Sequence, residues 1–223
     1  MPFYFLLFTF YFMRIRVHQH VNPLAPYFRF TPQPVDITRV FVNPALPIHL
    51  DIGSARGKFL LEMAEKTPYT NFLGVEIREP LVVEANLIKN ESGLNNLHYE
   101  FINATYSLDI YLEKIPPINT ITIQFPDPWY KKKHAKRRMV DLRLAKTIAD
   151  NLAENGRVFI QTDVEFLADE MFAIFRQVDC LQEVEVIENP FGVKTEREKA
   201  VEARQLPIYR KIFVKNYQTT SKL

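Results

Sequence analysis

The sequence is poor in the residues that form cross-links and metal sites. Its 223 residues include a single cysteine, Cys180, which excludes an internal disulfide framework and a cysteine-based zinc site and suits a reducing cytoplasm. The five histidines show no metal-ligand spacing, so we expect no metal centre. The formal net charge is only +2, so overall charge says little about partners. The sequence also has no internal repeat and no low-complexity segment.

The apolar run at the N-terminus is too short to cross a bilayer. PFYFLLFTFYFM has about a dozen residues, whereas a spanning helix needs roughly 20. A secretory signal carries its positive charge before the apolar run, but here Arg14 and Arg16 follow it. We therefore expect a cytoplasmic protein with no membrane partner. Because the composition changes abruptly at Met13, we interpret residues 1–12 as an apolar extension from a mis-called start. A membrane-surface or partner anchor is the alternative.

Length and hydrophobic content favour one globular domain. A chain of 223 residues that is 47% hydrophobic can bury one sizeable core but is short for two. The stretch from Pro23 to Pro47 is rich in proline and should be extended and wrap the surface. We expect an N-terminal segment over residues 13–46, a single domain over 47–218 and a tail over 219–223.

Short apolar runs alternate with amphipathic segments from residue 47 onward, as is typical of an α/β sheet. The runs predict strands at residues 47–53, 71–77, 97–103, 120–125, 154–162, 181–188 and 207–215. Helices are predicted at residues 57–66, 80–90, 140–152 and 164–178. The sequence thus predicts a Rossmann-like, doubly wound, mostly parallel seven-stranded sheet with helices on both faces. Its ligand crevice should lie at the carboxyl ends of the strands.

The segment DIGSARGKF joins the first predicted strand to the first helix. Gly53 and Gly57 would let the backbone approach a ligand closely, although an ordinary tight turn is the alternative. Glu76 ends the second strand about 20 residues later, where an acid accepts hydrogen bonds from both ribose hydroxyls. The loop lacks the full G-x-G-x-x-G of dinucleotide sites, and Asp51 precedes the first glycine, a place suited to an acid facing a cationic sulfonium. Methyl transfer from S-adenosylmethionine is therefore the leading hypothesis.

Asn103 ends the third predicted strand, near where an adenine would lie. Its amide could hydrogen-bond the edge of the ring, or the residue could cap the next helix.

The segment FPDPWYKKKHAKRR, from Phe125 to Arg138, places an acid beside a block of positive charge. Pro126 and Pro128 fix the backbone on both sides of Asp127, so its carboxylate has little orientational entropy to lose. A rigid turn with a core tryptophan is the alternative. Six Lys or Arg residues follow within eight positions and attract phosphate by counterion release. This favours a nucleic-acid contact, with a solvated charged loop as the alternative.

These segments resemble the bacterial tRNA (guanine-N7)-methyltransferases over nearly the whole chain after Met13. FPDPWYKKKHAKRR is the most specific match. DIGSARGKF resembles the cofactor loop of the family, GVEI its ribose-binding strand, FIQTD a strand with a substrate-site acid and TEREK its C-terminal substrate motif. The resemblance implies methyl transfer from S-adenosylmethionine to N7 of a guanine in tRNA, at variable-loop position 46, to give 7-methylguanosine. The expected partner is tRNA, with no obligate protein partner and a monomer or homodimer.

The resemblance also implies which residues form the site. Cofactor-binding residues are Asp51, Gly53, Gly57, Glu76, Asn103 and Asp127. Substrate-binding residues are Lys131, Asp163, Thr195, Glu196, Arg197 and Glu198, and RNA contacts are Lys133, His134, Lys136, Arg137 and Arg138. Ala55 stands where the family usually has a glycine. We expect Asp127 to be the catalytic residue, which accepts hydrogen bonds from the guanine and aims N7 at the methyl carbon with help from Asp163.

Three other functions stay open at this point. PDPW is similar to the Asp-Pro-Pro-Tyr type of motif that holds an exocyclic amine, so an amino-group methyltransferase is the nearest alternative. A non-catalytic RNA-binding module with a decayed pocket is the second, although the carboxylates at 51, 76 and 127 argue against it. A nicotinamide oxidoreductase is a more distant third.

Overall fold

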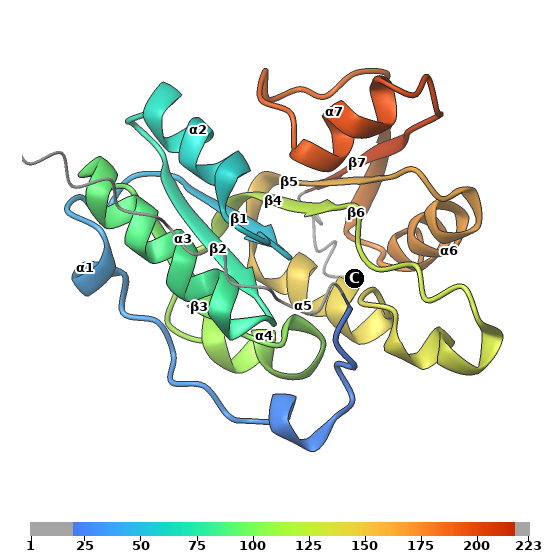
Figure 1. Ribbon diagram of the computed structural model, residues 1–223, viewed down its shortest axis with the longest axis horizontal. Helices are drawn as coiled ribbons and strands as arrows, with labels where there is room; N and C mark the ends of the chain where they lie inside the picture. Colours follow the sequence, from blue (N-terminus) through green and yellow to red (C-terminus); the bar gives the residue numbers. More distant parts are fainter. Residues whose placement is uncertain (1–19, 217–223) are drawn as a thin grey trace, which may run out of the picture.

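Seven strands form one sheet in the computed structural model, which describes residues 20–216 (Figure 1). The strand order is β3-β2-β1-β4-β5-β7-β6, and only β7 runs antiparallel to its neighbours. The strands are β1 (Ile48–Ile52), β2 (Asn71–Glu76), β3 (Leu97–Phe101), β4 (Ile118–Gln124), β5 (Leu152–Thr162), β6 (Leu181–Glu185) and β7 (Tyr209–Lys215). The predicted fold class is confirmed. The expectations for residues 1–12 and 219–223 lie outside the described residues.

Helices cover both faces of this sheet (Figure 1). They are α1 (Ile37–Val40), α2 (Lys58–Lys66), α3 (Glu79–Ser92), α4 (Ala104–Leu112), α5 (Leu142–Asn151), α6 (Glu165–Phe175) and α7 (Glu196–Glu202), with 3-10 helices η1 (Pro26–Phe28) and η2 (Lys132–Arg137). The four predicted helices correspond to α2, α3, α5 and α6. Sequence periodicity misses α4, which Ser107 interrupts with a non-helical φ of −141°, and α7, which has seven residues. Within residues 20–216, no helix is long and apolar enough to span a membrane.

Alternation along the strands divides the core into two hydrophobic clusters, one on each face of the sheet. In β1, Leu50 and Ile52 belong to the larger cluster, to which α4, α5 and α6 contribute. His49, which directly precedes Leu50, instead packs against Phe59 of α2 and Phe72 of β2, which belong to the smaller cluster. Because successive side chains of a strand point to opposite faces, Asp51 shares the face of His49. The sheet therefore has α2 and α3 on the Asp51 face and α4, α5 and α6 on the other.

The proline-rich segment before β1 wraps the surface, as expected, but it includes the short elements η1 and α1 (Figure 1). Val35 is buried, and its N–H donates to the carbonyl of Tyr111 in α4 (3.2 Å). In η1, the Tyr27 hydroxyl donates to Glu79 at the start of α3 (2.8 Å). These contacts attach the segment to the same domain.

The strand order reverses between β1 and β4, because the chain builds β2 and β3 on one side of β1 and β4 and β5 on the other. In open parallel sheets, the connections diverge at such a point and leave a crevice outside the carboxyl ends of the strands. Asp51 lies near the end of β1, Glu76 ends β2 and Gln124 ends β4. Three polar side chains that are distant in the sequence therefore meet at this edge.

Gly57, at the start of α2, must be glycine for a reason internal to the protein. Its φ of +73° lies in the left-handed region, which disfavours residues with a Cβ. Tyr99 of β3 also lies directly against it: the hydroxyl donates to the Gly57 carbonyl (2.6 Å), and a Cβ on Gly57 would lie 2.5 Å from the ring. Gly57 is thus required for α2 to begin against Tyr99.

We expect Gly57→Ala to destabilise the fold by about 3 kcal/mol, because the added methyl group meets both the left-handed backbone and the Tyr99 ring. Gly93→Ala is the matched control. Gly93 follows the last residue of α3 and has a similar left-handed φ of +69°, but nothing lies within 4 Å of its Cβ position. Its expected loss is about 1 kcal/mol, from the backbone alone. Urea unfolding measures both free energies, and equal losses would show that Tyr99 does not crowd Gly57.

Candidate active site at the carboxyl edge of the sheet

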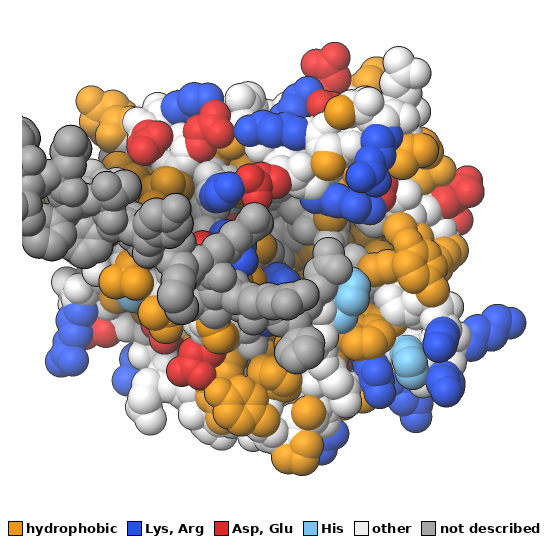
Figure 2. Space-filling view, in the orientation of Figure 1, with side chains coloured by type: hydrophobic (Ala, Val, Ile, Leu, Met, Phe, Trp, Pro, Cys, Tyr) orange, Lys and Arg blue, Asp and Glu red, His pale blue; other side chains and the backbone are white. Residues whose placement is uncertain are grey.

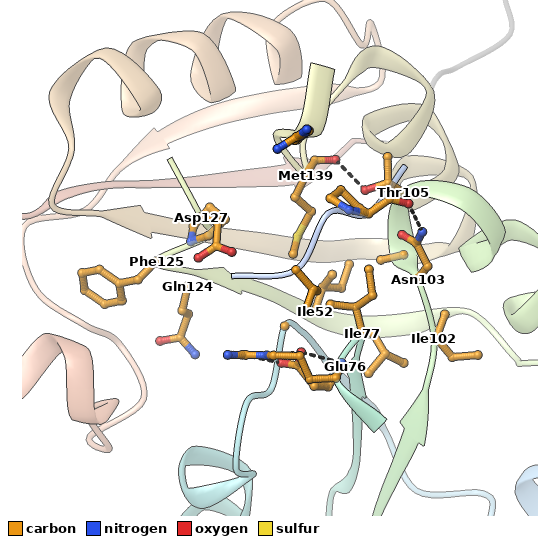
Figure 3. Close-up of a pocket in the computed structure, with 18 of the residues that line it drawn as sticks. Ile52, Glu76, Ile77, Ile102, Asn103, Thr105, Gln124, Phe125, Asp127 and Met139 are labelled. Atoms are coloured by element: carbon orange, nitrogen blue, oxygen red, sulfur yellow. Dashed lines mark hydrogen bonds and ion pairs between the residues drawn. The ribbon is translucent and has the colours of Figure 1, made fainter. Parts of the chain in front are cut away.

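Two adjoining cavities open at the carboxyl edge of the sheet. The first is bordered by Glu76, Asn103 and Met139, and Figure 3 shows these residues and Asp127 converging on it from separate segments. The second is bordered by the loop before α2, by Asp163 and by the start of α7. Residues that line both are Gly53, Arg78, Gln124, Phe125, Pro126 and Asp127. All the predicted cofactor residues except Gly57 therefore line one cavity or both.

Asp51 is buried in the sheet and receives its hydrogen bonds from β4. Its Oδ1 accepts from the Thr122 hydroxyl (2.6 Å) and from the Gln124 Nε2 (3.4 Å). Burial raises the pKa of Asp51 to about 6, while these two bonds lower it and the neighbouring Glu76 raises it further. The carboxyl group therefore changes charge near neutral pH at the wall of the second cavity.

Glu76 is 2% exposed, and its carboxylate is fully engaged within the protein. Oε1 accepts from the backbone N–H (3.0 Å) and Nε (2.8 Å) of Arg78, and Oε2 accepts from Arg78 Nη2 (3.1 Å) and the Ala55 N–H (2.9 Å). A carboxylate offers about four acceptor sites, so ribose hydroxyls can reach Glu76 only if the Arg78 guanidinium moves aside. Ala55 adopts φ +51°, a left-handed backbone that glycine adopts at no steric cost.

Asn103 lines the first cavity, but its side chain holds the N-terminal segment. Its Nδ2 donates to the carbonyls of Pro23 (2.9 Å) and Phe28 (3.1 Å), and the side chain makes no capping bond to α4. Asn103 therefore occupies the N-cap position of α4, as the alternative expects, but its side chain does not bond the helix. An adenine that accepts from this amide nitrogen would compete with both carbonyls. Val21 and Pro23 of the held segment complete the cavity wall.

Asp127 lies on a strained turn directly after β4. Phe125 has φ +51° and Trp129 has φ +44°, conformations that bulky residues rarely adopt, with Pro126 and Pro128 between them. Such strain costs on the order of 1–3 kcal/mol per residue and concentrates at functional sites. The Asp127 side chain is 40% exposed and lies 2.7 Å from the His20 Nδ1. The turn therefore presents one rigidly held carboxylate to both cavities.

Four of the six predicted substrate residues line the second cavity, one of them after β5 and three at the start of α7, and each is bonded to another residue of the protein. Asp163 is ion-paired with Arg197, and Glu196 is ion-paired with Lys58 of α2. The Thr195 hydroxyl accepts from the Glu198 N–H (3.0 Å) and so caps α7. A ligand in this cavity thus meets ion pairs rather than an isolated Asp163 carboxylate.

Glu198 reaches neither cavity. Its side chain is 0% exposed, and its carboxylate accepts from Arg210 Nη2 (2.9 Å), Gln161 Nε2 (3.0 Å) and Asn189 Nδ2 (2.8 Å). These three donors satisfy the buried charge and tie α7 to β5 and β7. The expectation that Glu198 contacts the substrate is corrected: its carboxylate is internal.

The basic block, residues 131–138, forms η2 next to the Asp127 turn. Figure 2 shows Lys and Arg side chains gathered around a histidine at the edge of the molecule, where Figure 1 places the chain between β4 and α5. His134 and Arg137 pack against Trp129, with ring centroids 5.7 Å apart for His134 and the Arg137 Cζ 4.9 Å from the Trp129 ring. The exposed members are Lys131, Lys132, Lys133 and Lys136. Lys131, a predicted substrate residue, lines neither cavity.

Arg138 is used inside the protein. Its side chain is 12% exposed and ion-paired with Glu170, its Cζ lies 5.0 Å from the Phe166 ring centroid, and its Nε donates to the Pro128 carbonyl (3.1 Å). The predicted RNA contact is corrected for this residue. Arg138 holds the Asp127 turn against α6.

Sequence reasoning misses several polar residues of the cavity walls, among them His20, Lys58, Arg78 and Gln124. Gln124 carries a usable signal, since it lies at the carboxyl end of a predicted strand, as Glu76 does. The other three are brought in by contacts between distant segments. Among residues 20–216, no group of three or more His, Cys, Asp or Glu side chains could hold a metal ion.

We expect Arg138→Lys to destabilise the protein by about 1–3 kcal/mol, because a lysine cannot bond Pro128 and Glu170 together while it covers Phe166. Lys136→Ala, at an exposed position of the same block, should change stability by less than about 0.5 kcal/mol. Chemical unfolding of both variants tests this, and equal stabilities would remove Arg138 from the support of the turn.

Comparison with known proteins gives close relatives. A family model described as "Putative methyltransferase" matches residues 45–211. A relative from Trichormus variabilis, named tRNA (guanine-N(7)-)-methyltransferase, is 47% identical over 205 residues, 89% of this chain and 95% of the relative. Relatives of the same name from Synechococcus elongatus and Microcystis aeruginosa are 46% and 44% identical, covering 91% and 90% of this chain and 97% and 98% of their own.

Solved structures are similar in fold alone. The 16S rRNA methyltransferase KamB has a TM-score of 0.57 at 10% identity and covers 81% of this chain and 91% of its own. The [4+2]-cyclase SpnF has a TM-score of 0.54 at 12% identity, with 82% and 79% covered. The close relatives, by contrast, share nearly half of their residues with this chain over most of its length. They confirm the resemblance in the sequence: the chain belongs to the tRNA (guanine-N7)-methyltransferase family.

Proposed function

We propose that this protein transfers a methyl group from S-adenosylmethionine to N7 of the variable-loop guanine at position 46 of tRNA, in the cytoplasm. The observation that carries the proposal is the strained turn that holds Asp127 where the two cavities meet, next to the exposed lysines of the basic block. The names of the close relatives support the same reaction.

The residues around the cavities fit the cofactor. Ser54, in the loop after β1, has a buried hydroxyl with no hydrogen-bond partner among residues 20–216, and the residue lines the second cavity. A polar ligand would supply that partner once the hydroxyl, which lies against Gly74, rotates toward the cavity. Glu76 would bond the ribose hydroxyls once Arg78 moves aside, and ionised Asp51 would face a cationic ligand. When bound, S-adenosylmethionine supplies an activated methyl group on a sulfonium.

Guanine N7 needs no general base, because it has a lone pair in the ring plane and no proton. The work of the protein is therefore to orient the base. Asp127 accepts hydrogen bonds from the N–H groups on the Watson–Crick edge and so fixes the direction of N7. The methylated base is cationic, and the carboxylates at this edge stabilise the charge that develops on it.

The basic block supplies affinity for the tRNA backbone. Lys131, Lys133 and Lys136 are exposed to phosphate, while His134 and Arg137 lie against Trp129. Phosphate contacts offset the few kcal/mol that are needed to take the target base out of its stack. Asp163, paired with Arg197, acts as part of the substrate wall.

Incubation with radiolabelled S-adenosylmethionine and unmodified bulk tRNA, followed by nucleoside analysis, tests the proposal. We expect label in 7-methylguanosine, and Asp127→Asn should lower single-turnover transfer by at least about 100-fold, because the amide cannot accept the same pair of bonds. The exposed Asp179→Asn is the control and should be unaffected. Label in another nucleoside would favour an amino-methyltransferase, and unchanged transfer by Asp127→Asn would remove its catalytic role.

The Asp51 carboxyl predicts how cofactor affinity depends on pH. With a pKa of about 6 in the protein, Asp51 is neutral in acid and ionised above neutrality. Because only the ionised form attracts a cation, we expect S-adenosylmethionine to bind about tenfold more weakly at pH 5 than at pH 7.5. Calorimetric titration measures the affinities. In Asp51→Asn, the affinity for S-adenosylmethionine should change little between pH 7.5 and pH 5. If the affinity of Asp51→Asn still falls about tenfold at pH 5, another titrating group causes the pH dependence.

A further inference from the structure

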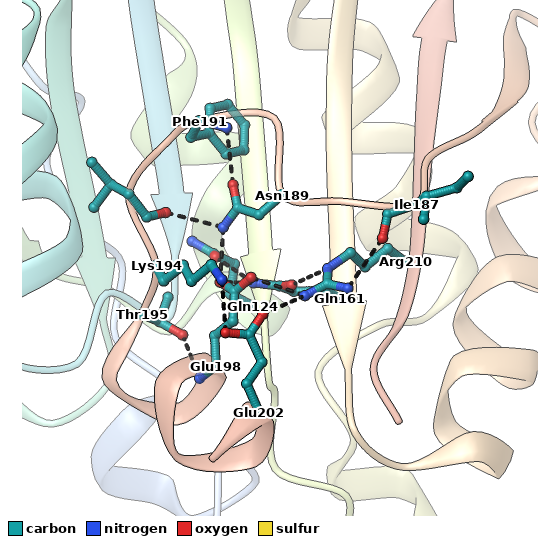
Figure 4. Close-up of polar contacts among 11 residues, drawn as sticks. Gln124, Gln161, Ile187, Asn189, Phe191, Lys194, Thr195, Glu198, Glu202 and Arg210 are labelled. Atoms are coloured by element: carbon teal, nitrogen blue, oxygen red, sulfur yellow. Dashed lines mark hydrogen bonds and ion pairs between the residues drawn. The ribbon is translucent and has the colours of Figure 1, made fainter. Parts of the chain in front are cut away.

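A row of polar side chains crosses the sheet next to α7, where Figure 4 shows Arg210, Gln161 and Gln124. The row ends at Asp51. Arg210 of β7 is the cross-strand partner of Gln161 in β5, and Gln161 is the partner of Gln124 in β4. Arg210 Nε donates to Gln161 Oε1 (3.0 Å), Gln161 Nε2 donates to Gln124 Oε1 (2.8 Å) and Gln124 Nε2 donates to Asp51 Oδ1 (3.4 Å). The row therefore connects the interior beside α7 with the wall of the second cavity.

The orientation of the Gln161 amide is fixed by two charged partners. An arginine can only donate, so Arg210 must face the Gln161 oxygen. An ionised carboxylate can only accept, so Glu198 must face the Gln161 nitrogen, 3.0 Å away. Turning the amide over would set donor against donor and acceptor against acceptor in a site where Gln161 is 0% exposed. Such unsatisfied buried groups are costly, so one orientation is selected.

The fixed amide of Gln161 determines that of Gln124. The second N–H of the Gln161 amide points at Gln124, so the Gln124 side-chain oxygen must accept this hydrogen bond. The Gln124 nitrogen is then turned toward Asp51, and Gln124 lines both cavities. Without Gln161, the Gln124 amide could rotate and bring its oxygen toward the carboxylate.

We propose that Gln161 and Gln124 are positioning residues, through which the buried Glu198 of α7 keeps an N–H donor directed at Asp51. The proposal rests on the proposed function for its consequence, which is tighter binding of the cationic cofactor by an ionised Asp51. It also gives Glu198, which touches neither cavity, a way to act on the site from inside the protein.

Other groups also act on Asp51 and limit the size of the effect. Thr122 donates to the same oxygen, and because its only hydroxyl hydrogen is used there, His49 Nε2 must donate to Thr122 (3.2 Å). Glu76 of β2 and Tyr99 of β3 face Asp51 from the other side. Since Thr122 does not depend on Glu198, the loss of the row should weaken cofactor binding several-fold rather than abolish it.

A double-mutant cycle on full-length protein tests the proposal. Calorimetry without tRNA gives the dissociation constant for S-adenosylmethionine in wild type, Gln124→Met, Gln161→Met and the double variant. We expect losses of about fivefold for Gln124→Met and about threefold for Gln161→Met, with the double variant within about twofold of Gln124→Met alone. If the loss of affinity in the double variant equals the product of the two single losses, the residues act independently and the proposal is wrong. Gln177→Met, at an exposed position just after α6, should leave the affinity unchanged.

Two further measurements keep the test decisive. If circular dichroism shows that Gln161→Met is unfolded, Glu198→Gln replaces it, since this change removes the acceptor-only partner at nearly constant volume. Carbon-13 NMR titration of the Asp51 carboxyl in cofactor-free protein should show a higher pKa in Gln124→Met and in Gln161→Met than in wild type. An unchanged titration overturns the proposal. If the wild type does not bind S-adenosylmethionine but the Asp51 pKa still rises in the variants, the proposed function is wrong. The positioning role of Gln161 and Gln124 toward Asp51 would still hold.

Discussion

Three buried carboxylates at or behind the carboxyl edge of the sheet must each find donors inside the protein. Asp51 is 4% exposed, Glu76 is 2% and Glu198 is 0%. An ionised acid in such a place is tolerated only when hydrogen bonds replace the water it has lost. Asp51 draws on β4, Glu76 on Arg78 and the loop before α2, and Glu198 on β5, β7 and the loop before α7. Satisfying these acids therefore sets where the surrounding loops and α7 can lie.

The sheet was predictable because its central strands are buried on both faces and are rich in apolar residues. Asp51, Glu76 and Asp127 could be found in the sequence because each lies at or just after the carboxyl end of a predicted strand. The roles of Arg137 and Arg138 could not, although the two are adjacent. One packs on Trp129 and the other pairs with Glu170, and the choice depends on how η2 is set against α6. The prediction that Glu198 contacts the substrate was wrong for a similar reason. Glu198 is in α7, whereas its partners Gln161 and Arg210 come from β5 and β7.

The fold alone leaves the chemistry undetermined. The cyclase SpnF shares this fold at 12% identity, so one fold supports different reactions. What distinguishes this chain is local: the Pro-Asp-Pro turn between two aromatic residues of positive φ, and the cations that follow it. Hydrogen bonds on both sides hold the strained backbone at Phe125 and Trp129. The Phe125 N–H donates to the backbone carbonyl of Gln161 (2.8 Å), and Arg138 Nε donates to the Pro128 carbonyl (3.1 Å).

The position of β7 has a consequence for synthesis of the chain. β7 lies between β5 and β6, although the ribosome makes it after both. Until residues 209–215 emerge, β6 has no strand to pair with and Glu198 lacks the guanidinium of Arg210. A nascent chain can thus form the β1 to β4 half of the edge, with Asp51, Glu76 and Asp127, before the α7 side is complete. The α7 side of the second cavity is therefore completed last, and a chain that lacks β7 would leave the buried Glu198 without its guanidinium partner.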